Sequence, residues 1–257
     1  MMRIFPHHWF SKLNAATERR AEAARQEKAM RAFYSRFVGP GDLCFDVGAN
    51  LGNRTAILLG LGSRVIAIEP QPACVKRLRK HFGKNENIVI VEAALGEKEG
   101  HGELAICEQE PTISTMSDRW KSEGRFAGEN QWTKTVPVEV TTLDCLVARY
   151  GTPEFCKIDV EGFEVSVIKG LSRPIPVISF EFTREFFTDA KSAIDHLLSI
   201  GPAVFNASFG ESMALLDERW MTPGEIYERI DAEGDAFLWG DIYARLGRSG
   251  RRVKSGY

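Results

Sequence analysis

The sequence is poor in the features that mark secreted, membrane or nucleic-acid-binding proteins. Its 257 residues contain only five cysteines, with no C-x-x-C pair, so we expect reduced thiols, no disulfide framework and no zinc site. No apolar run approaches the about eighteen residues of a membrane span, and the opening MMRIFPHHWF lacks the continuous apolar segment of a signal peptide. The formal net charge of −2 is not basic. These absences predict a cytoplasmic protein with no integral membrane segment and no nucleic-acid partner.

The ends of the chain differ in pattern from its middle. Residues 11–37 predict a helix whose apolar residues Met30, Phe33 and Phe37 share one stripe, and a glycine-proline pair near residue 40 ends it. We therefore expect a helical extension over residues 1–40, one domain over 41–244, and a basic flexible tail over 245–257. The extension either docks on the domain or binds a partner, and a homo-oligomer stays open.

From residue 42, short apolar runs alternate with helical stretches, a pattern typical of βαβ units and a mostly parallel sheet. The predicted strands are Leu43–Val47, Arg64–Glu69, Ile88–Glu92, Glu154–Asp159 and Pro176–Phe182. The predicted helices are Arg54–Leu61, Pro72–Phe82, Leu143–Tyr150, Phe163–Leu171 and Ala190–Ile200. Right-handed crossovers bring the carboxyl ends of such strands to one edge, where open α/β folds bind ligands. Residues 96–142 form an unusually long interval, which we expect to be a variable loop or a lid.

The segment Asp46-Val47-Gly48-Ala49-Asn50-Leu51-Gly52 links a predicted strand directly to a helix. Glycines at such a turn let a ligand approach the backbone, and the helix N-terminus offers free N–H groups. Asn50 stands where dinucleotide-binding turns carry their second glycine. A side chain there disfavours a pyrophosphate and favours S-adenosylmethionine, which has no phosphate. Asp46 is a candidate partner for its amino-acid end.

Acidic residues follow the next two predicted strands. Glu69 lies about twenty residues after the glycine turn, where its carboxylate can accept hydrogen bonds from both ribose hydroxyls. Glu92 and Ala93 end the following strand, at the expected position of an adenine ring. Because NAD and S-adenosylmethionine share the adenosine, these residues predict adenosine binding without choosing between the two.

The fourth predicted strand ends in a charged run, from Lys157 to Glu164. With a period of two residues, Lys157 and Asp159 share one face of the strand. A buried lysine without a partner is costly, so Asp159, Glu181 on the neighbouring strand, or a substrate should pair with it. The same residues can equally form an ion-pair network that only supports the strand ends.

In order and spacing, these motifs resemble the FkbM family of methyltransferases over about residues 42–182. The segments that carry the resemblance are Phe45–Gly52, Ile68–Pro70, Ala93–Gly96, Ser114–Thr115, Thr142–Asp144 and Lys157–Glu164. The resemblance implies a Rossmann-like class I methyltransferase fold, an α/β architecture with a mostly parallel seven-stranded sheet and helices on both faces. It also implies S-adenosylmethionine-dependent O-methylation, mostly of sugars or secondary metabolites.

Three groups of site residues follow as hypotheses. The expected cofactor-binding residues are Asp46, Gly48, Asn50, Gly52, Glu69, Glu92, Ala93 and Asp159. The expected catalytic residues are Lys157, Asp159 and Glu161, with Asp159 or a neighbour as the base and Lys157 orienting the acceptor. The expected residues toward a glycan or small-molecule acceptor are Ser114, Thr115 and Glu181. We assign no residue to a metal, because no histidine shows ligand spacing.

Three other functions remain as alternatives. A dinucleotide oxidoreductase is disfavoured by Asn50, and a nucleic-acid methyltransferase by the Asp-Val-Glu-Gly ending of the fourth strand. A binding module that keeps the fold without catalysis would bind the cofactor and methylate no acceptor.

Overall fold

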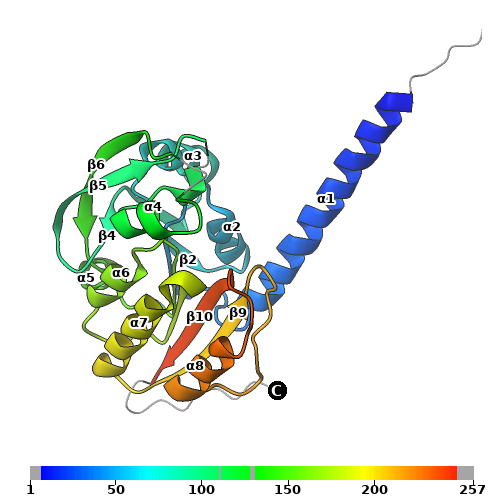
Figure 1. Ribbon diagram of the computed structural model, residues 1–257. Helices are drawn as coiled ribbons and strands as arrows, with labels where there is room; N and C mark the ends of the chain where they lie inside the picture. Colours follow the sequence, from blue (N-terminus) through cyan, green and yellow to red (C-terminus); the bar gives the residue numbers. More distant parts are fainter. Residues whose placement is uncertain (1–6, 110, 128–130, 248–257) are drawn as a thin grey trace, which may run out of the picture.

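A seven-stranded sheet forms the centre of the molecule (Figure 1). The computed structural model describes residues 7–109, 111–127 and 131–247. In spatial order, the strands are β3 (Ile88–Val91), β2 (Arg64–Ile68), β1 (Leu43–Val47), β7 (Phe155–Ile158), β8 (Val177–Thr183), β10 (Trp239–Leu246) and β9 (Ala203–Phe209). Only β10 runs against the others, since it pairs antiparallel with both β8 and β9. The expected seven-stranded, mostly parallel sheet is confirmed.

Helices cover both faces of this sheet, as predicted. The helices are α1 (His7–Tyr34), α2 (Asn53–Gly60), α3 (Pro72–Phe82), α4 (Asp118–Glu123), α5 (Leu143–Tyr150), α6 (Glu164–Lys169), α7 (Phe187–Ile200) and α8 (Pro223–Asp231). One apolar cluster joins the sheet to α2, α3 and the end of α1, and another joins it to α5 through α8. The central strands are therefore buried on both sides, which explains their continuous apolar runs.

Apart from those of β1, α3 and α5, the predicted boundaries differ from the observed ones by at most a few residues. Helix α7 begins at Phe187, three residues before the expected Ala190, because a 3₁₀ turn feeds directly into it. Strand β10 continues to Leu246. Arg245, expected at the start of the tail, therefore lies in the sheet, with its guanidinium 4.1 Å from the ring centroid of Trp220. Residues 248–257, the remainder of the expected tail, lie outside the described residues.

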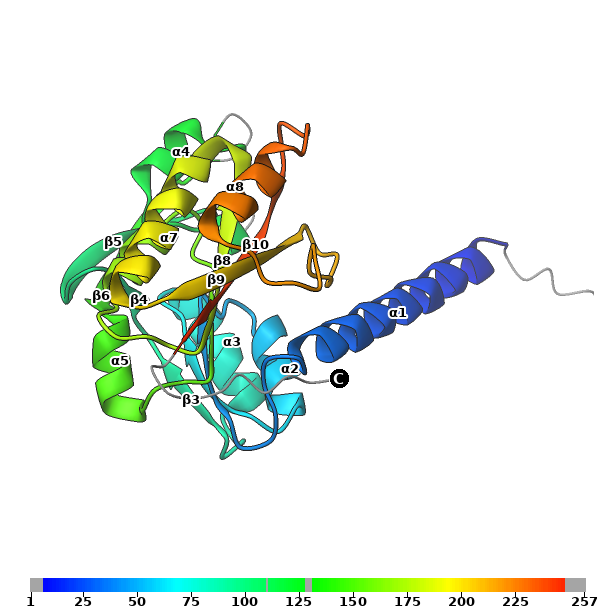
Figure 2. The ribbon, with the colours of Figure 1, turned by 90° about the horizontal axis from the view of Figure 1, so that it is seen from below.

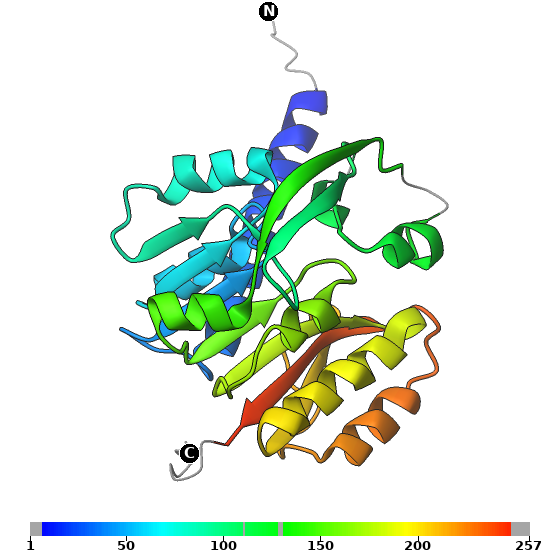
Figure 3. The ribbon, with the colours of Figure 1, turned by 90° about the vertical axis from the view of Figure 1, so that its left-hand side faces the viewer.

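The interval 96–142 contains regular structure instead of the predicted long loop. Strand β6 (Lys134–Thr141) pairs with β5 (Gly100–Ile106) and with β4 (Ala94–Leu95), forming a second sheet. Figure 3 shows this sheet and α4 to one side of the large sheet. The sequence carried a signal for β6, because valines at every second position form one apolar face. Three residues within the interval's second half, 128–130, are not described.

The N-terminal helix α1 extends away from the body of the molecule, and only its C-terminal end packs against the domain (Figure 2). There, Phe33 and Tyr34 are buried beside α2. Phe37 stacks on both Phe155 of β7 and Tyr243 of β10, with ring centroids 5.7 and 5.2 Å apart. The end of the extension is therefore part of the core. Among the described residues, no helix combines the length and apolar character that crossing a bilayer requires.

The loop between β7 and α6 is fixed by the first residue of α6. The Oε1 atom of Glu164 accepts hydrogen bonds from the backbone N–H groups of Val160 and Gly162, at 3.0 and 3.3 Å. Burial nevertheless raises the pKa of Glu164 to about 7. This loop lies at the carboxyl edge of the sheet, so Glu164 helps to set the shape of that edge.

Replacing Phe33 should destabilise the protein, because the aromatic packing between the end of α1 and the sheet would be lost. We expect Phe33→Ala to lower the free energy of unfolding by about 3 kcal/mol, because it leaves a cavity between α1 and the sheet. Urea denaturation measures the change. The matched control is Phe237→Ala, where the side chain is 69% exposed and the expected change is below about 0.5 kcal/mol. A Phe33→Ala variant as stable as this control would contradict the packing described.

Glu164→Gln should change how stability depends on pH. The folded-state pKa lies above the ordinary value of 4.5, so the folded protein holds the proton longer and loses stability as pH rises toward 7. The glutamine oxygen can keep both hydrogen bonds but does not titrate. We expect equal stabilities near pH 4, and a variant roughly 3 kcal/mol more stable above pH 7. Urea denaturation across this range that shows a pH-independent difference would refute the assignment.

Candidate functional site at the carboxyl edge of the sheet

The turn after β1 is shaped by two glycines with different tasks. A Cβ atom on Gly48 would lie 1.8 Å from the carbonyl oxygen of Asp159, so only glycine fits between β1 and the loop after β7. A Cβ atom on Gly52 would instead meet the side chains of Phe82 and Leu78 on α3. Gly48 thus brings the turn against the edge of the sheet, whereas Gly52 lets α2 and α3 pack closely.

Glu69 locks this turn to the end of β2. Its Oε2 atom accepts the backbone N–H of Asn50 and its Oε1 atom accepts that of Gln71, both at 2.8 Å. Asn50 adopts a left-handed backbone conformation with φ of 48°, which asparagine tolerates better than most residues. Burial raises the pKa of Glu69 to about 7 against these two hydrogen bonds. Each carboxylate oxygen keeps a lone pair for a further donor.

A cavity open to solvent lies over this turn, and we call it the turn cavity. Its lining includes Gly48, Asn50, Glu69, Gln71, Ala93, Ser114, Met116, Asp159, Glu161 and Phe163. Apolar walls with a few placed polar groups are typical of sites for small organic ligands. A nucleoside fits this donor set, because Glu69 offers two acceptor oxygens for a diol and the apolar side chains offer packing for a base.

Lys157 is buried in the sheet and fully engaged by carboxylates. Its side chain is 2% exposed, and Nζ lies 3.0 Å from Asp159 Oδ2 and 3.1 Å from Asp241 Oδ1. Burial alone would lower the pKa of Lys157, but these two carboxylates raise it well above its usual value. Asp159 was an expected partner. Asp241 on β10 takes the place expected for Glu181, its neighbour in the register of β8 and β10.

A second cavity, also open to solvent, adjoins the turn cavity. We call it the acidic cavity, because five of its lining residues are acids: Asp46, Asp159, Glu161, Glu181 and Glu211. Lys157, Arg54 and Trp239 also line it. The two cavities share Gly48, Asn50, Thr112, Asp159 and Glu161. A ligand in one cavity and a ligand in the other would therefore meet at Asp159 and Glu161.

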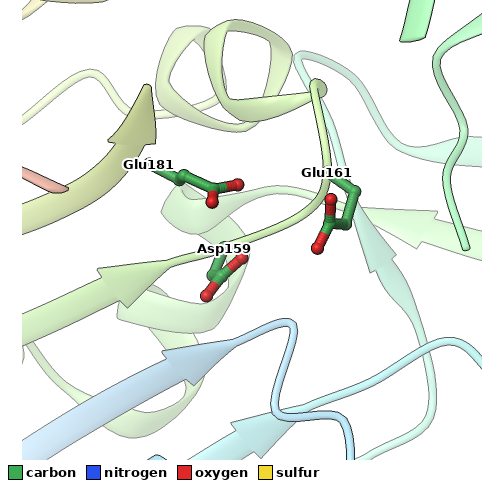
Figure 4. Close-up of side chains that lie close together, drawn as sticks. All are labelled: Asp159, Glu161 and Glu181. Atoms are coloured by element: carbon green, nitrogen blue, oxygen red, sulfur yellow. The ribbon is translucent and has the colours of Figure 1, made fainter. Parts of the chain in front are cut away.

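Three carboxylates converge at this boundary (Figure 4). One oxygen from each of Asp159, Glu161 and Glu181 lies within 4.8 Å of the other two. Burial, followed by repulsion from Asp159, raises the pKa values of Glu161 and Glu181 well above the usual range. Positive charge at this group would relieve the repulsion, and its oxygen ligands are of the kind that Mg²⁺ accepts.

The inserted segment holds the loop that carries Glu161. Thr115 is 1% exposed, and its hydroxyl donates to the Glu161 carbonyl oxygen at 2.6 Å. Glu161 itself has φ of 55°, a sparsely populated conformation for a residue with a side chain. Trp120 of α4 packs against the adjacent Gly162. The insertion therefore fixes the position of Glu161 from outside the large sheet.

The structure brings most of the expected site residues together. Gly48, Asn50, Glu69, Ala93, Asp159, Glu161 and Ser114 line the turn cavity, and Lys157 and Glu181 line the acidic cavity. Asp46 also lines the acidic cavity, but it is 2% exposed and accepts the hydroxyl of Thr55. Three expected residues lie elsewhere. Glu92 pairs with Arg79 at 2.9 Å. Gly52 packs against α3, and Thr115 is enclosed behind Glu161.

Sequence reasoning missed the contribution of the C-terminal third. Asp241 and Trp239 lie on β10, and the half-buried Arg54 side chain donates hydrogen bonds to both carboxylate oxygens of Glu211 at 2.7 Å. Asp241 follows no recognisable motif, so only the pairing of β10 with β8 reveals it.

Comparisons with known proteins show the family of this chain. The description "Methyltransferase FkbM domain" applies to a family that matches residues 46–218. The hexuronic acid methyltransferase AglP of Haloferax volcanii is 26% identical over 139 residues, which cover 54% of each protein. The chain thus spans about half the length of this curated relative.

The solved structures that resemble this chain do so at low identity. The precorrin-6y C5,15-methyltransferase of Geobacter metallireducens is 14% identical, with a TM-score of 0.45 over 85% of this chain and 86% of that one. EvdMO1 is 12% identical, with a TM-score of 0.44 over 87% of this chain and 41% of that one. These scores carry no functional argument, whereas the family match covers most of the chain and its first residues are those of the glycine turn. The chain belongs to the FkbM methyltransferase domain family.

Proposed function

We propose that this protein is an S-adenosylmethionine-dependent O-methyltransferase that acts on a hydroxyl group of a sugar, a glycan or a small metabolite. The observation that carries the proposal is the junction of the two cavities at Asp159 and Glu161. It lets one cavity hold a nucleoside and the other an acceptor, with carboxylates between them. The sugar part of the proposal is supported by the name of the relative AglP.

The turn cavity is the proposed cofactor site. Glu69 would bind the ribose hydroxyls, the Gly48–Asn50 backbone would lie along the amino-acid end, and Ala93 would lie beside the base. When bound, S-adenosylmethionine supplies an electrophilic methyl group on a sulfonium and leaves as the neutral thioether. A pyrophosphate would have to approach Asn50, whose side chain occupies the position of a glycine in dinucleotide sites.

The acidic cavity is the proposed acceptor site, with the carboxylates as proton acceptors. An attacking hydroxyl must lose its proton as the new C–O bond forms, and a carboxylate within hydrogen-bond reach can take it. Glu161 and Glu181 suit this task best, because a raised pKa makes each a stronger base than an ordinary carboxylate. Asp159 is held by Lys157, so Lys157 acts as a positioning residue in this scheme.

A binding module without catalysis is the second candidate, since Lys157, Asp159 and Asp241 form a satisfied ion-pair network. That network accounts for Lys157 but leaves Glu161 and Glu181 without a structural partner. Among the described residues, neither glutamate forms a salt bridge or a side-chain hydrogen bond. Two carboxylates without a salt bridge or a hydrogen bond beside a cavity favour a catalytic role.

Glu69→Ala should weaken cofactor binding. The variant removes the acceptors for the ribose and for the turn, so we expect the Kd for S-adenosylhomocysteine to rise by about 10- to 100-fold. Calorimetric titration measures it. The control is Glu92→Ala, which removes an acid paired outside the cavity and should leave Kd within about threefold. Equal effects of both substitutions would contradict the placement of the ribose.

Glu161→Gln and Glu181→Gln should each impair turnover without loss of cofactor affinity. We expect kcat to fall by about 100-fold or more for at least one of them, because a proton acceptor is lost. Methyl transfer from labelled cofactor to a panel of glycosides is the assay. Glu154→Gln, at the opposite end of β7 and exposed, is the matched control. Full turnover in both cavity variants would show that neither carboxylate takes part in the reaction.

A further inference from the structure

The acidic cavity holds more negative charge than its own cations balance. Its lining contains five carboxylates against two cations, Arg54 and Lys157, which leaves three formal negative charges. Both cations are already engaged. Lys157 contacts Asp159 and Asp241, and Arg54 contacts both oxygens of Glu211.

Glu161 and Glu181 are the carboxylates left over. Within the described ranges, no lysine, arginine or histidine nitrogen lies within 4.0 Å of either one. The bound cofactor would add one net positive charge, from its sulfonium, since its ammonium and carboxylate cancel. Two formal negative charges then remain beside the acceptor. An anionic acceptor would meet them without a free cation to receive it.

The rim of the cavity adds an aromatic surface. Trp239, at the start of β10, lines the cavity and is 37% exposed. An aromatic ring beside carboxylates is a common arrangement for binding an ammonium group, because the ring face and the carboxylates both attract positive charge. The same ring can also pack on the C–H face of a sugar. The carboxylates and the aromatic ring at this cavity therefore favour an acceptor that combines a positive charge with the C–H face of a sugar.

On the basis of the proposed function, we infer that the acceptor is a polyhydroxylated molecule bearing an ammonium group, such as an amino sugar. Glu161 and Glu181 would receive its ammonium and hydroxyl groups, with Trp239 at the rim. Acceptors that bear a carboxylate or a phosphate would be excluded by the same charges. Such selectivity differs from what a site for uronic acids requires, namely a free arginine or lysine.

Three methyl glycosides that differ in one substituent test the inference: those of glucosamine, glucose and glucuronic acid. Each is titrated calorimetrically against the full chain, with and without saturating S-adenosylhomocysteine. We expect the glucosaminide to bind about tenfold more tightly than the glucoside, and about 100-fold more tightly than the glucuronide. Equal affinities, a preference for the glucuronide, or no glucosaminide binding up to about 50 mM would overturn the inference.

Variants connect the preference to the two glutamates. Glu161→Gln and Glu181→Gln should each reduce the ratio of glucosaminide to glucuronide affinity by about tenfold, while the exposed Glu103→Gln should leave it unchanged. Retained binding of S-adenosylhomocysteine shows that a variant is folded. An unchanged ratio in both cavity variants refutes the role of these residues. Failure of the wild type to bind S-adenosylhomocysteine would instead refute the proposed function. In that case, the glycoside titrations without S-adenosylhomocysteine still test the charge preference.

Discussion

A buried lysine at the end of a central strand is the constraint around which the carboxyl edge is arranged. Lys157 cannot keep its charge inside the sheet without anionic partners, and it has Asp159, which directly follows its own strand, and Asp241 from β10. These contacts join β7 to the antiparallel β10 across β8. They also hold Asp159 at the boundary of the two cavities, while Glu161 and Glu181 remain available.

Much of the fold was readable from the sequence because the pattern is local. Strand β1 and helices α3 and α5 have the predicted bounds, since apolar periodicity and turn residues determine them. The second sheet was missed although valines alternate along β6. The strands of this sheet pack through a separate, small apolar cluster. They need few apolar residues for it, so their composition resembles that of a loop.

The candidate site was predictable where residues follow a strand or the glycine turn. Glu69 and Asp159 are of this kind, because the carboxyl ends of parallel strands meet at one edge. Asp46 and Glu92 obey the same rule in sequence, yet one side chain lies beneath the turn and the other outside the cavity. Side-chain direction separates these cases. Asp241 and Trp239 depend on the long-range pairing of β10, which no local pattern encodes.

The central claim is that the turn cavity binds the cofactor with its sulfur toward the three carboxylates. A crystal structure of the protein with S-adenosylhomocysteine tests it most directly. The account predicts the ribose hydroxyls on Glu69, and the sulfur facing the boundary formed by Asp159 and Glu161. A ligand bound away from the glycine turn, or a sulfur directed away from these carboxylates, would contradict it.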